Sequence, residues 1–461
     1  MRHGRRAFLA GSAAFAVAPL SLALARIREF ELTAAPARVN LVGEKYPATD
    51  VWAFNGSVPG PVLRAKQGET LRIRYRNRLP EESTVHWHGI RLPNAMDGVP
   101  YLTQPPVPPG GEFLYEYRVP DAGTWWYHPH ANSSRQLGRG LYGALIVEDA
   151  EPPFADRDEV WVLSDFRLDR EARVTADFGH PRDQSHDGRV GNTVTVNGRL
   201  AEAFAMRRGE RLRLRLVNAA NARIFRLKFE GHHPLVIALD GHAVEPHAVP
   251  EGVVLGPGMR ADVMIDAIGE PASRHRVVDD WTRAAAYHLL DLAYETAVLR
   301  DGPVRTAVRA PRANPLSEPD IARAERFQLV LGGGAKSPAL VRATPEERRK
   351  LAERMRAGDM WTINEHAHRG HVHAPLYRLT RGASYVFEVW NDTAWHHPLH
   401  LHGVVFRVIT EARRPWRDTV LLAPGERAAL AFVADNPGDW MIHCHILEHQ
   451  ESGMMASMRI E

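Results

Sequence analysis

The sequence has one cysteine, little net charge and, after its first 25 residues, no long apolar run. Cys444 therefore cannot form an internal disulfide, and a lone thiol calls for another role such as metal binding. The formal charge is +3, and Arg2, Arg5 and Arg6 lie in a first segment that has no acids. A chain cleaved after that segment would be nearly neutral, which argues against nucleic acid and anionic lipid as partners. The lack of later apolar runs argues against stable membrane insertion.

The first 25 residues are typical of an export signal. Arg5 and Arg6 precede a run rich in alanine and leucine that ends at Ala23-Leu24-Ala25. This order of basic, apolar and small residues predicts a removable signal peptide at residues 1–25, cleaved near Ala25, and the paired arginines favour the twin-arginine export machinery. A membrane anchor is the alternative, but the run is short and rich in alanine and glycine. We expect the mature protein in the periplasm.

Three segments of the chain repeat the same spacing. In each, a glycine lies nine residues before an asparagine, with an alternating strand pattern between them: Gly68 and Asn77, Gly209 and Asn218, Gly382 and Asn391. A Pro-Gly pair follows later in each copy, at 109–110, 257–258 and 424–425. Equal spacing predicts three copies of one β domain, at residues 26–150, 151–305 and 306–461.

The pattern within the copies predicts an all-β fold. Short alternating strands separated by Gly and Pro turns indicate consecutive Greek-key β-sandwiches. In the second copy Arg211, Arg213 and Arg215 alternate with leucine, which predicts a strand whose arginine face meets solvent. One short helix is expected as an insertion in the third domain, because Thr344 and Glu347 form a capping-box pattern around Pro345.

Histidine pairs stand at matched offsets from these landmarks in the first and third copies only. Nine and eleven residues after the asparagine lie His86 and His88, and His400 and His402; the second copy has Leu227 and Phe229 there. Nineteen residues after the Pro-Gly proline begin the pairs His128 and His130, and His443 and His445; the second copy has Arg276 there. Alternate residues of a strand point the same way, so each pair presents two imidazoles together. Eight neutral imidazoles suit copper and are too many for one zinc or iron ion.

The single cysteine lies inside one of these pairs. Cys444 is followed by His449 and then Met454 at five-residue steps, and His397 lies three residues before His400. A thiolate, two imidazoles and a distant thioether are the ligand set of a blue copper site that cycles between Cu(I) and Cu(II). The neighbours of Cys444 in the chain point to the opposite side of the strand, so electrons could cross between two sites through covalent bonds. The first copy has Ser83, Pro129, Ser134 and Arg139 at the four corresponding places, so one such site is expected.

These motifs resemble those of the multicopper oxidase family. They comprise residues 86–89, 126–130, 397–403 and 443–454. The resemblance implies cupredoxin-like domains and an oxidase that couples one-electron oxidation of a phenolic or low-valent metal donor, such as Cu(I), Mn(II) or Fe(II), to reduction of O2 to water. It also implies four copper ions. The type 1 ion would be held by His397, Cys444, His449 and Met454, and the type 2 ion by His86 and His400. The type 3 pair would be held by His88, His128 and His445 and by His130, His402 and His443.

Within that family the chain is similar to bacterial three-domain laccase-like enzymes, which include cuprous oxidases and proteins proposed as manganese oxidases. The runs at residues 96–100 and 121–127 match the manganese-associated type best. Only Met355 and Met360 stand where cuprous oxidases carry a methionine-rich insertion, which lowers the expectation of Cu(I) as donor. We expect a monomer.

Three further residues are candidates for roles around the copper ions. Asp97, nine residues after His88, stands where the family has an acid that assists proton delivery; an Asp-Gly turn is the alternative, and both can hold at once. Gln450 stands where relatives often carry a glutamate, which Glu451 could replace. Asp418 resembles an acid placed beside the blue copper, where it could contact the donor and His397 or His449. The alternatives for Asp418 are a turn cap or an ion pair with Arg413, Arg414 or Arg417.

Other interpretations of the histidines remain open. The chain could be a copper-storage protein or a non-catalytic periplasmic scaffold, although scaffold relatives lose ligands and here every ligand position is filled. A further cluster comprises His366, His368, His371 and His373. It could dock a substrate metal, but a solvent-exposed polar hairpin is the preferred interpretation because no repeat supports the cluster.

Overall fold

The described residues form six β-sheets, which fall into three pairs along the chain. The computed structural model describes residues 26–282, 286–370 and 374–461. The predicted signal peptide and two histidines of the 366–373 cluster, His371 and His373, lie outside the described residues. The all-β expectation is confirmed. Each predicted domain range, 26–150, 151–305 and 306–461, encloses one pair of sheets.

The strands follow one another within each pair. The first pair has sheets in the order β2-β1-β4-β6 and β3-β8-β7-β5. Its strands are β1 (Ile27–Val39), β2 (Thr49–Phe54), β3 (Leu63–Lys66), β4 (Thr70–Asn77), β5 (His86–His88), β6 (Glu112–Arg118), β7 (Gly123–His128) and β8 (Gly143–Glu148).

The second pair has sheets in the order β10-β9-β12-β17-β14-β15 and β11-β19-β18-β13-β16. Its strands are β9 (Arg157–Phe166), β10 (Thr193–Val196), β11 (Ala203–Arg208), β12 (Arg211–Asn218), β13 (Phe225–Phe229), β14 (Leu235–Leu239), β15 (His242–Ala248), β16 (Val253–Leu255), β17 (Arg260–Asp266), β18 (Arg274–Asp279) and β19 (Tyr287–Val298).

The third pair has sheets in the order β21-β20-β23-β28-β25-β26 and β22-β30-β29-β24-β27. Its strands are β20 (Glu325–Gly333), β21 (Trp361–Ile363), β22 (Tyr377–Leu379), β23 (Ser384–Asn391), β24 (His397–Leu401), β25 (Phe406–Val408), β26 (Trp416–Arg417), β27 (Thr419–Leu422), β28 (Arg427–Val433), β29 (Gly438–Cys444) and β30 (Met455–Ile460).

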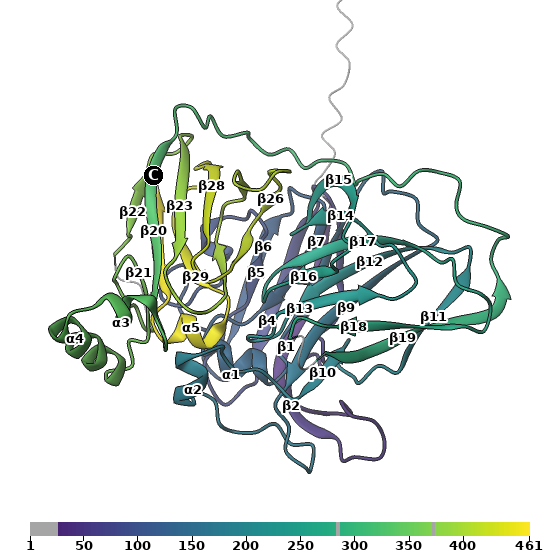
Figure 1. The fold of residues 1–461 in the computed structure, drawn as a ribbon, viewed down its shortest axis with the longest axis horizontal. Coiled ribbons are helices and arrows are strands. Elements are labelled where there is room, and N and C mark those ends of the chain that lie inside the picture. Colours follow the sequence, from purple (N-terminus) through teal and green to yellow (C-terminus); the bar gives the residue numbers. More distant parts are fainter. Residues whose placement is uncertain (1–25, 283–285, 371–373) are drawn as a thin grey trace, which may run out of the picture.

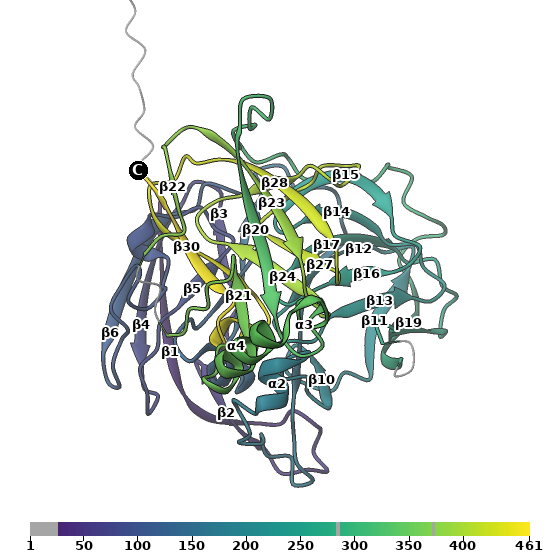
Figure 2. The ribbon, with the colours of Figure 1, turned by 60° about the vertical axis from the view of Figure 1, so that its left-hand side comes forward.

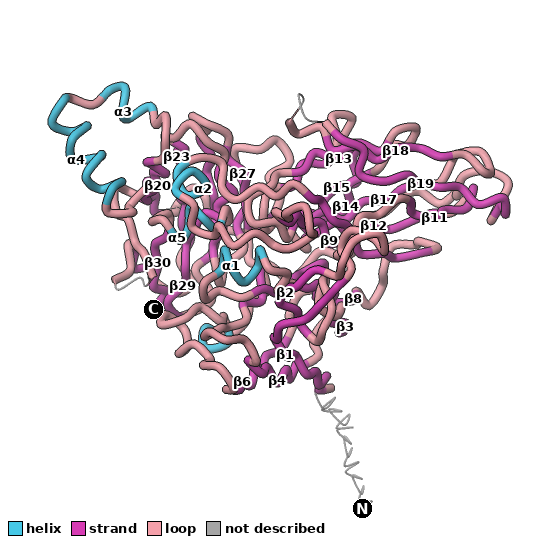
Figure 3. The backbone as a smooth tube through the Cα atoms, turned by 90° about the horizontal axis from the view of Figure 1, so that it is seen from below, coloured by secondary structure: helices cyan, strands magenta, loops and turns pink. Residues whose placement is uncertain are grey.

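Helices are few and short, as Figure 3 shows. They are the 3-10 turn at Asn94–Met96 and helices α1 (Ser133–Gly138), α2 (Pro181–Ser185), α3 (Pro338–Arg342), α4 (Pro345–Arg356) and α5 (Leu447–Glu451). The helix expected after Thr344 is α4, and its capping box forms as predicted. It buries no side chain and projects from the third pair of sheets (Figure 1). No helix among the described residues is long and apolar enough to cross a membrane.

The repeated landmarks perform the same structural task in each copy. In every copy one strand pairs in parallel with the first and antiparallel with a later one: β4 with β1 and β6, β12 with β9 and β17, β23 with β20 and β28. The asparagine at its end donates its amide hydrogens to backbone carbonyls across the next turn, as Asn218 does to those of Arg223 and Leu255 at 2.8 Å. Gly68, Gly209 and Gly382 have φ between +82° and +86°, a region that side chains disfavour.

One expectation about the second copy is wrong. Arg211, Arg213 and Arg215 on β12 are all buried rather than solvated. Arg213 and Arg215 both lie against Asp262, and Arg215 also donates to the hydroxyl of Thr124 in the first copy at 2.9 Å. The arginine face of this strand therefore meets another domain, and buried acids balance its charge.

The three pairs of sheets lie around a common centre. Figure 1 shows the third pair on the left and the second on the right, with the first behind them, and Figure 2 shows the same grouping after a turn of the view. Side chains from all three meet there: His88 of the first, Arg260 of the second and Asp418 of the third are in direct contact. A site at this point can take residues from every copy.

Candidate metal centre

The eight histidines of the four His-x-His pairs converge at this junction. Strands β5 and β7 pair so that His86 lies opposite His128, and β24 and β29 pair so that His400 lies opposite His443. The two sheets face each other, and rings from the first copy stack on rings from the third: His86 on His402 with centroids 4.0 Å apart, and His88 on His400 at 3.8 Å. None of the eight side chains is more than 5% exposed.

Most of these rings have one nitrogen fixed by an oxygen atom. The N–H groups donate to backbone carbonyls or to carboxylates: His86 Nδ1 to the Asp97 carbonyl at 2.8 Å, His88 Nε2 to Asp418 Oδ1 at 3.1 Å, His128 Nδ1 to the Pro129 carbonyl at 3.0 Å, His400 Nδ1 to the Asp418 carbonyl at 2.8 Å, His402 Nδ1 to Asp97 Oδ2 at 2.9 Å and His443 Nδ1 to the Cys444 carbonyl at 2.9 Å. Because the acceptors are oxygens without hydrogens, they fix the tautomers.

The other ring nitrogens of the cluster are buried, and within the described parts of the chain their lone pairs have no hydrogen to accept. Among the described residues no hydrogen-bond partner is found for Nε2 of His86, His128, His130 and His400, for Nδ1 of His88 or for either ring nitrogen of His445. The Nε2 atoms of His402 and His443 face each other at 3.0 Å although both rings already carry their proton on Nδ1. Buried polar atoms without partners are costly, and facing lone pairs repel, so the arrangement fits metal ions. The donor set of imidazoles fits copper.

Burial keeps these imidazoles neutral. Loss of solvent lowers the pKa of His88, His128, His130, His400, His402 and His445 well below the usual value, and neighbouring imidazoles lower it further. Burial lowers the pKa of His443 to about 4. At neutral pH these rings are uncharged and their lone pairs are available to metal.

A second group of ligands lies on the other side of the same strand. His397 Nδ1 is 3.3 Å and His449 Nδ1 is 3.7 Å from the sulfur of Cys444, and the two Nδ1 atoms are 3.2 Å apart. Their Nε2 atoms are held elsewhere, that of His397 by Thr393 Oγ1 at 2.8 Å and that of His449 by the His186 carbonyl at 2.7 Å. Burial raises the pKa of Cys444, so its thiolate needs a bound cation.

Met454 is buried beside this triad, and its carbonyl accepts the N–H of Cys444 at 3.1 Å. Sets of potential ligand atoms within 4.8 Å of one another include His397, Cys444 and His449, and also His130, His402 and His443. These two sets coincide with groups expected from the sequence. His86 falls in one set with His88 and His128 and in another with His400 and His402, so the division of ligands between individual ions stays a prediction.

Asp97 lies at the histidine cluster and in a turn at once. Its carboxylate accepts from His402, its carbonyl accepts from His86, and its side chain is buried. Gly98 has φ +83°, and a Cβ there would lie 1.9 Å from the Val85 carbonyl, so the tight turn requires glycine. The turn interpretation of the Asp-Gly pair is confirmed, and the contacts of Asp97 with the histidines leave its part in proton delivery a prediction.

The prediction that Asp418 contacts the donor beside His397 or His449 is wrong. Asp418 has no exposed surface and lies at the eight-histidine cluster. In the pairing of β27 with β24, Thr419 lies opposite His400 and Leu422 lies opposite His397, so Asp418 is not the residue that faces either histidine across the strands. Its carboxylate forms two hydrogen bonds to Arg260, at 2.6 and 2.7 Å. The ion-pair alternative was right in kind, but the partner is 158 residues away in the second copy.

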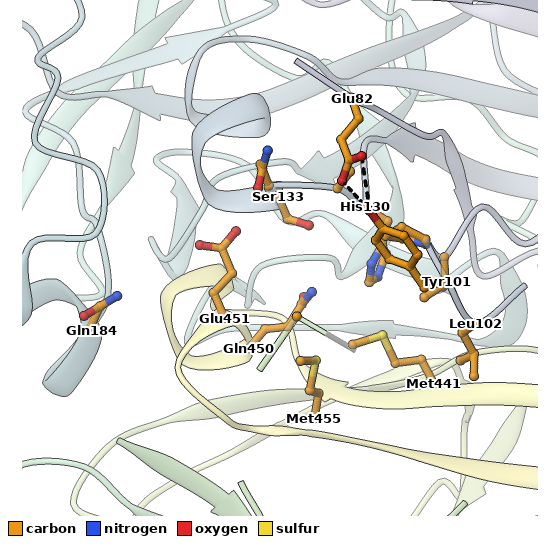
Figure 4. Close-up of a pocket in the computed structure, with 15 residues that line it drawn as sticks. Glu82, Tyr101, Leu102, His130, Ser133, Gln184, Met441, Gln450, Glu451 and Met455 are labelled. Carbon is orange, nitrogen blue, oxygen red and sulfur yellow. Dashed lines mark hydrogen bonds between the residues drawn. The ribbon is translucent and has the colours of Figure 1, made fainter. Parts of the chain in front are cut away.

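Two cavities open near these groups. One, of about 450 Å³, reaches His130 and is lined by Gln450, Glu451, Met441, Met455 and Tyr101 among others (Figure 4). Burial raises the pKa of Glu451 to about 7, although its carboxylate accepts the N–H of Ser134. The other, of about 230 Å³, is lined by Trp281, Trp395, His396, Asp187, Arg223 and Ile446 among others. It adjoins the Cys444 triad, because its wall residues are chain neighbours of His397 and of His186.

Several of these residues could not be found from the sequence. His186 and Arg260 act through contacts with distant parts of the chain, and no local spacing marks them. Thr393 lies only four residues before its partner His397, but it is outside the sequence motifs singled out above. The second histidine cluster is described only in part: His366 lies on an exposed turn, with its ring centre 6.3 Å from that of His368.

The fold and the site define a cupredoxin-type copper protein with a cysteine-containing site next to a large histidine cluster. Family models described as multicopper oxidase match residues 37–152, 158–303 and 341–461. The chain is 31% identical to multicopper oxidase MmcO of Mycobacterium tuberculosis, over 92% of this chain and 85% of that protein. It is 26% identical to a copper resistance protein A homolog of Pseudomonas syringae pv. tomato, over 94% and 92%.

Solved structures agree with these matches. The crystal structure of a multi-copper oxidase from Pseudomonas thermotolerans superposes with a TM-score of 0.82 at 35% identity, covering 95% of this chain and 100% of that one. One from Pseudomonas parafulva gives 0.81 at 37% identity, covering 94% and 100%. The chain belongs to the multicopper oxidase family. It is a copper-dependent oxidoreductase that uses O2 as electron acceptor.

The buried neutral histidines predict a pH dependence of the copper-free protein. A histidine whose pKa is lowered in the fold stabilises the fold above its unfolded pKa of about 6.5 and loses that contribution as the pH falls toward its folded value, about 4 for His443. The urea midpoint of copper-free protein should therefore fall between pH 6.5 and 4. His443→Gln should flatten the fall, whereas His233→Gln, at an exposed histidine, should leave it unchanged. A midpoint that stays constant over this range would contradict the burial of neutral imidazoles.

Proposed function

We propose that the chain takes electrons one at a time from a donor at a type 1 copper site and passes them to a three-copper cluster that reduces O2 to water. The type 1 ligands are His397, Cys444, His449 and Met454, and the cluster ligands are the eight paired histidines. Bound copper supplies one-electron Cu(I)/Cu(II) chemistry at the first site and, at the cluster, storage of the electrons that O2 needs. The observation that carries the proposal is the position of Cys444 between His443 and His445, which connects the two sites.

The connection consists of this chain's own atoms. The sulfur of Cys444 lies in the triad, while its two chain neighbours lie in the histidine cluster. A hydrogen bond of 2.9 Å from His443 Nδ1 to the Cys444 carbonyl adds a second short link. Electrons can therefore move along covalent bonds of one strand end, without a mobile carrier.

Asp97 orients two cluster histidines and is the group we propose for proton delivery. Its Oδ2 holds His402, and its Oδ1 lies 3.2 Å from His86 Nδ1. Reduction of O2 to water consumes protons, and a buried carboxylate at the cluster can hold and release them. The cavity that reaches His130 supports a role as the route by which O2 enters and water leaves (Figure 4).

The smaller cavity supports a donor site for single-ring phenols. Trp281 and Trp395 provide aromatic walls, and Asp187 can accept the phenolic proton as an electron leaves. At about 230 Å³ the space is below the roughly 300–1,000 Å³ of drug-sized pockets, which suits one ring. Its described lining residues include one carboxylate, Asp187, and one guanidinium, Arg223, whereas Mn(II) or Fe(II) would favour several oxygen ligands. The predicted signal peptide supports a periplasmic location.

Replacement of Cys444 tests the electron path. Cys444→Ser should abolish the blue charge-transfer absorption and the oxidase activity, because the sulfur is both ligand and first atom of the path. The type 2 copper EPR signal should persist, since the eight paired histidines are unchanged. A variant that keeps its blue colour would falsify the assignment.

Asp97→Asn tests proton delivery. The variant keeps a side chain that can accept from a histidine but cannot release a proton, so O2 reduction should slow by about 100-fold or more, the lower end of the usual range for a general acid. Anaerobic bleaching of the blue band by donor should keep its rate. Stopped-flow absorption separates the two half-reactions, and slower anaerobic bleaching would place Asp97 on the donor side instead.

Asp187→Asn tests the donor cavity. Loss of one charge-assisted contact of about 1.4 kcal/mol predicts a roughly tenfold lower kcat/KM for a phenol. Turnover of ferrocyanide, which has no phenolic proton, should not change. Asp301→Asn, at an exposed aspartate in a distant cavity, is the matched control. If the wild type prefers Mn(II), Fe(II) or Cu(I) over phenols in kcat/KM, the phenol assignment is wrong.

A further inference from the structure

The second copy carries no paired histidines, yet it forms part of the wall of the histidine cluster. The Pro257-Gly258 turn packs against it: a Cβ on Gly258 would lie 2.8 Å from the His445 ring and 3.0 Å from the His88 ring. Arg260 follows directly, at the start of β17, with no exposed surface. A buried arginine this close to a cation site is costly unless its charge is paired and its N–H groups are hydrogen-bonded.

Every nitrogen of the Arg260 guanidinium is bound. Nη1 and Nη2 donate to the two oxygens of Asp418, Nη1 also donates to the Gly258 carbonyl at 3.1 Å, and Nε donates to the Thr124 carbonyl at 3.2 Å. The group lies over the ring of Trp125, 5.3 Å from its centroid. This planar, two-pronged contact fixes both the position and the plane of the Asp418 carboxylate, which a lysine could not do.

Asp418 in turn fixes two histidines of the cluster from different copies. Its Oδ1 accepts from His88 Nε2 and from the hydroxyl of Thr419, at 3.1 and 2.8 Å. Its carbonyl accepts from His400 Nδ1. The His88 contact determines which nitrogen of that ring stays free, and the free atom, Nδ1, is buried without a partner among the described residues.

The Arg260–Asp418 pair packs directly against the backbone next to His88. Gly89, next to His88, has φ +83°, and a Cβ there would lie 2.2 Å from Asp418 Oδ2 and 2.6 Å from Arg260 Nη2. The carboxylate and the guanidinium therefore fill the space that a side chain at this position would need. Residues from all three copies close around the pair.

We propose that Arg260 is a positioning residue for the copper cluster: it holds Asp418 so that His88 and His400 present their free nitrogens to copper. This inference rests on the proposed function, since it assumes that the eight histidines bind copper. It gives the second copy, which lacks ligands, a direct part in building the site.

Arg260→Met tests the proposal, with Arg213→Met as matched control. Arg213 is also a buried arginine of the second copy paired with an aspartate, Asp262, but it does not contact the paired histidines. In Arg260→Met the cluster should bind copper about 10- to 100-fold more weakly in a chelator competition, the usual effect of losing a group that orients a ligand. Its type 2 EPR spectrum should change while the blue absorption of the type 1 site stays. Arg213→Met should leave both spectra and the copper affinity unchanged.

Arg260→Lys keeps the charge but not the two-pronged contact, so it should show the same change in the type 2 spectrum with a smaller loss of affinity. If Arg260→Met does not fold, the copper affinity and the type 2 spectrum of Arg260→Lys test the proposal instead. A folded Arg260 variant with wild-type copper affinity and an unchanged type 2 spectrum would overturn the proposal. A wild-type protein that binds copper but shows no type 2 signal would instead contradict the proposed function.

Discussion

The structure depends on the burial of uncharged imidazoles whose free lone pairs point at one another. In the absence of a cation, the facing Nε2 atoms of His402 and His443 and the partnerless nitrogens around them would cost free energy that the fold must recover elsewhere. In six of the eight rings the opposite nitrogen is held by a backbone carbonyl or by one of two buried aspartates, Asp97 and Asp418. The protein thus fixes the geometry of its ligands before copper binds.

This constraint explains why three similar domains are needed although only two carry ligands. The first and third each present two pairs of histidines, and the cluster forms only where the two sheets face each other. The second domain closes the remaining side with Gly258 and Arg260, and its His186 carbonyl also holds His449 of the Cys444 triad. Under the proposed function, oxidation of a donor and reduction of O2 would take place on opposite faces of one strand end at Cys444.

The repeats made much of this predictable from sequence. Matched offsets locate the strands, and the two-residue period of a strand determines where a histidine pair points. The four histidine pairs and the Cys444 triad could therefore be predicted from spacing alone. Contacts between domains have no such local signal. Asp418 was placed with the donor because its chain neighbours suggested it, whereas its partner Arg260 is remote in sequence. For the same reason the arginines of β12 were expected in solvent, although an acid and another domain cover them. The signal peptide remains a prediction.

The central claim is that the two sites work together to reduce O2 fully. Simultaneous measurement of donor oxidation and O2 uptake by the copper-loaded protein, with an assay for hydrogen peroxide, tests it most directly. Coupling of the two sites should give four one-electron donor oxidations per O2 consumed and no peroxide. Two oxidations per O2 with accumulation of peroxide would contradict transfer of electrons to a three-copper cluster, and bound copper without O2 uptake would indicate a storage protein.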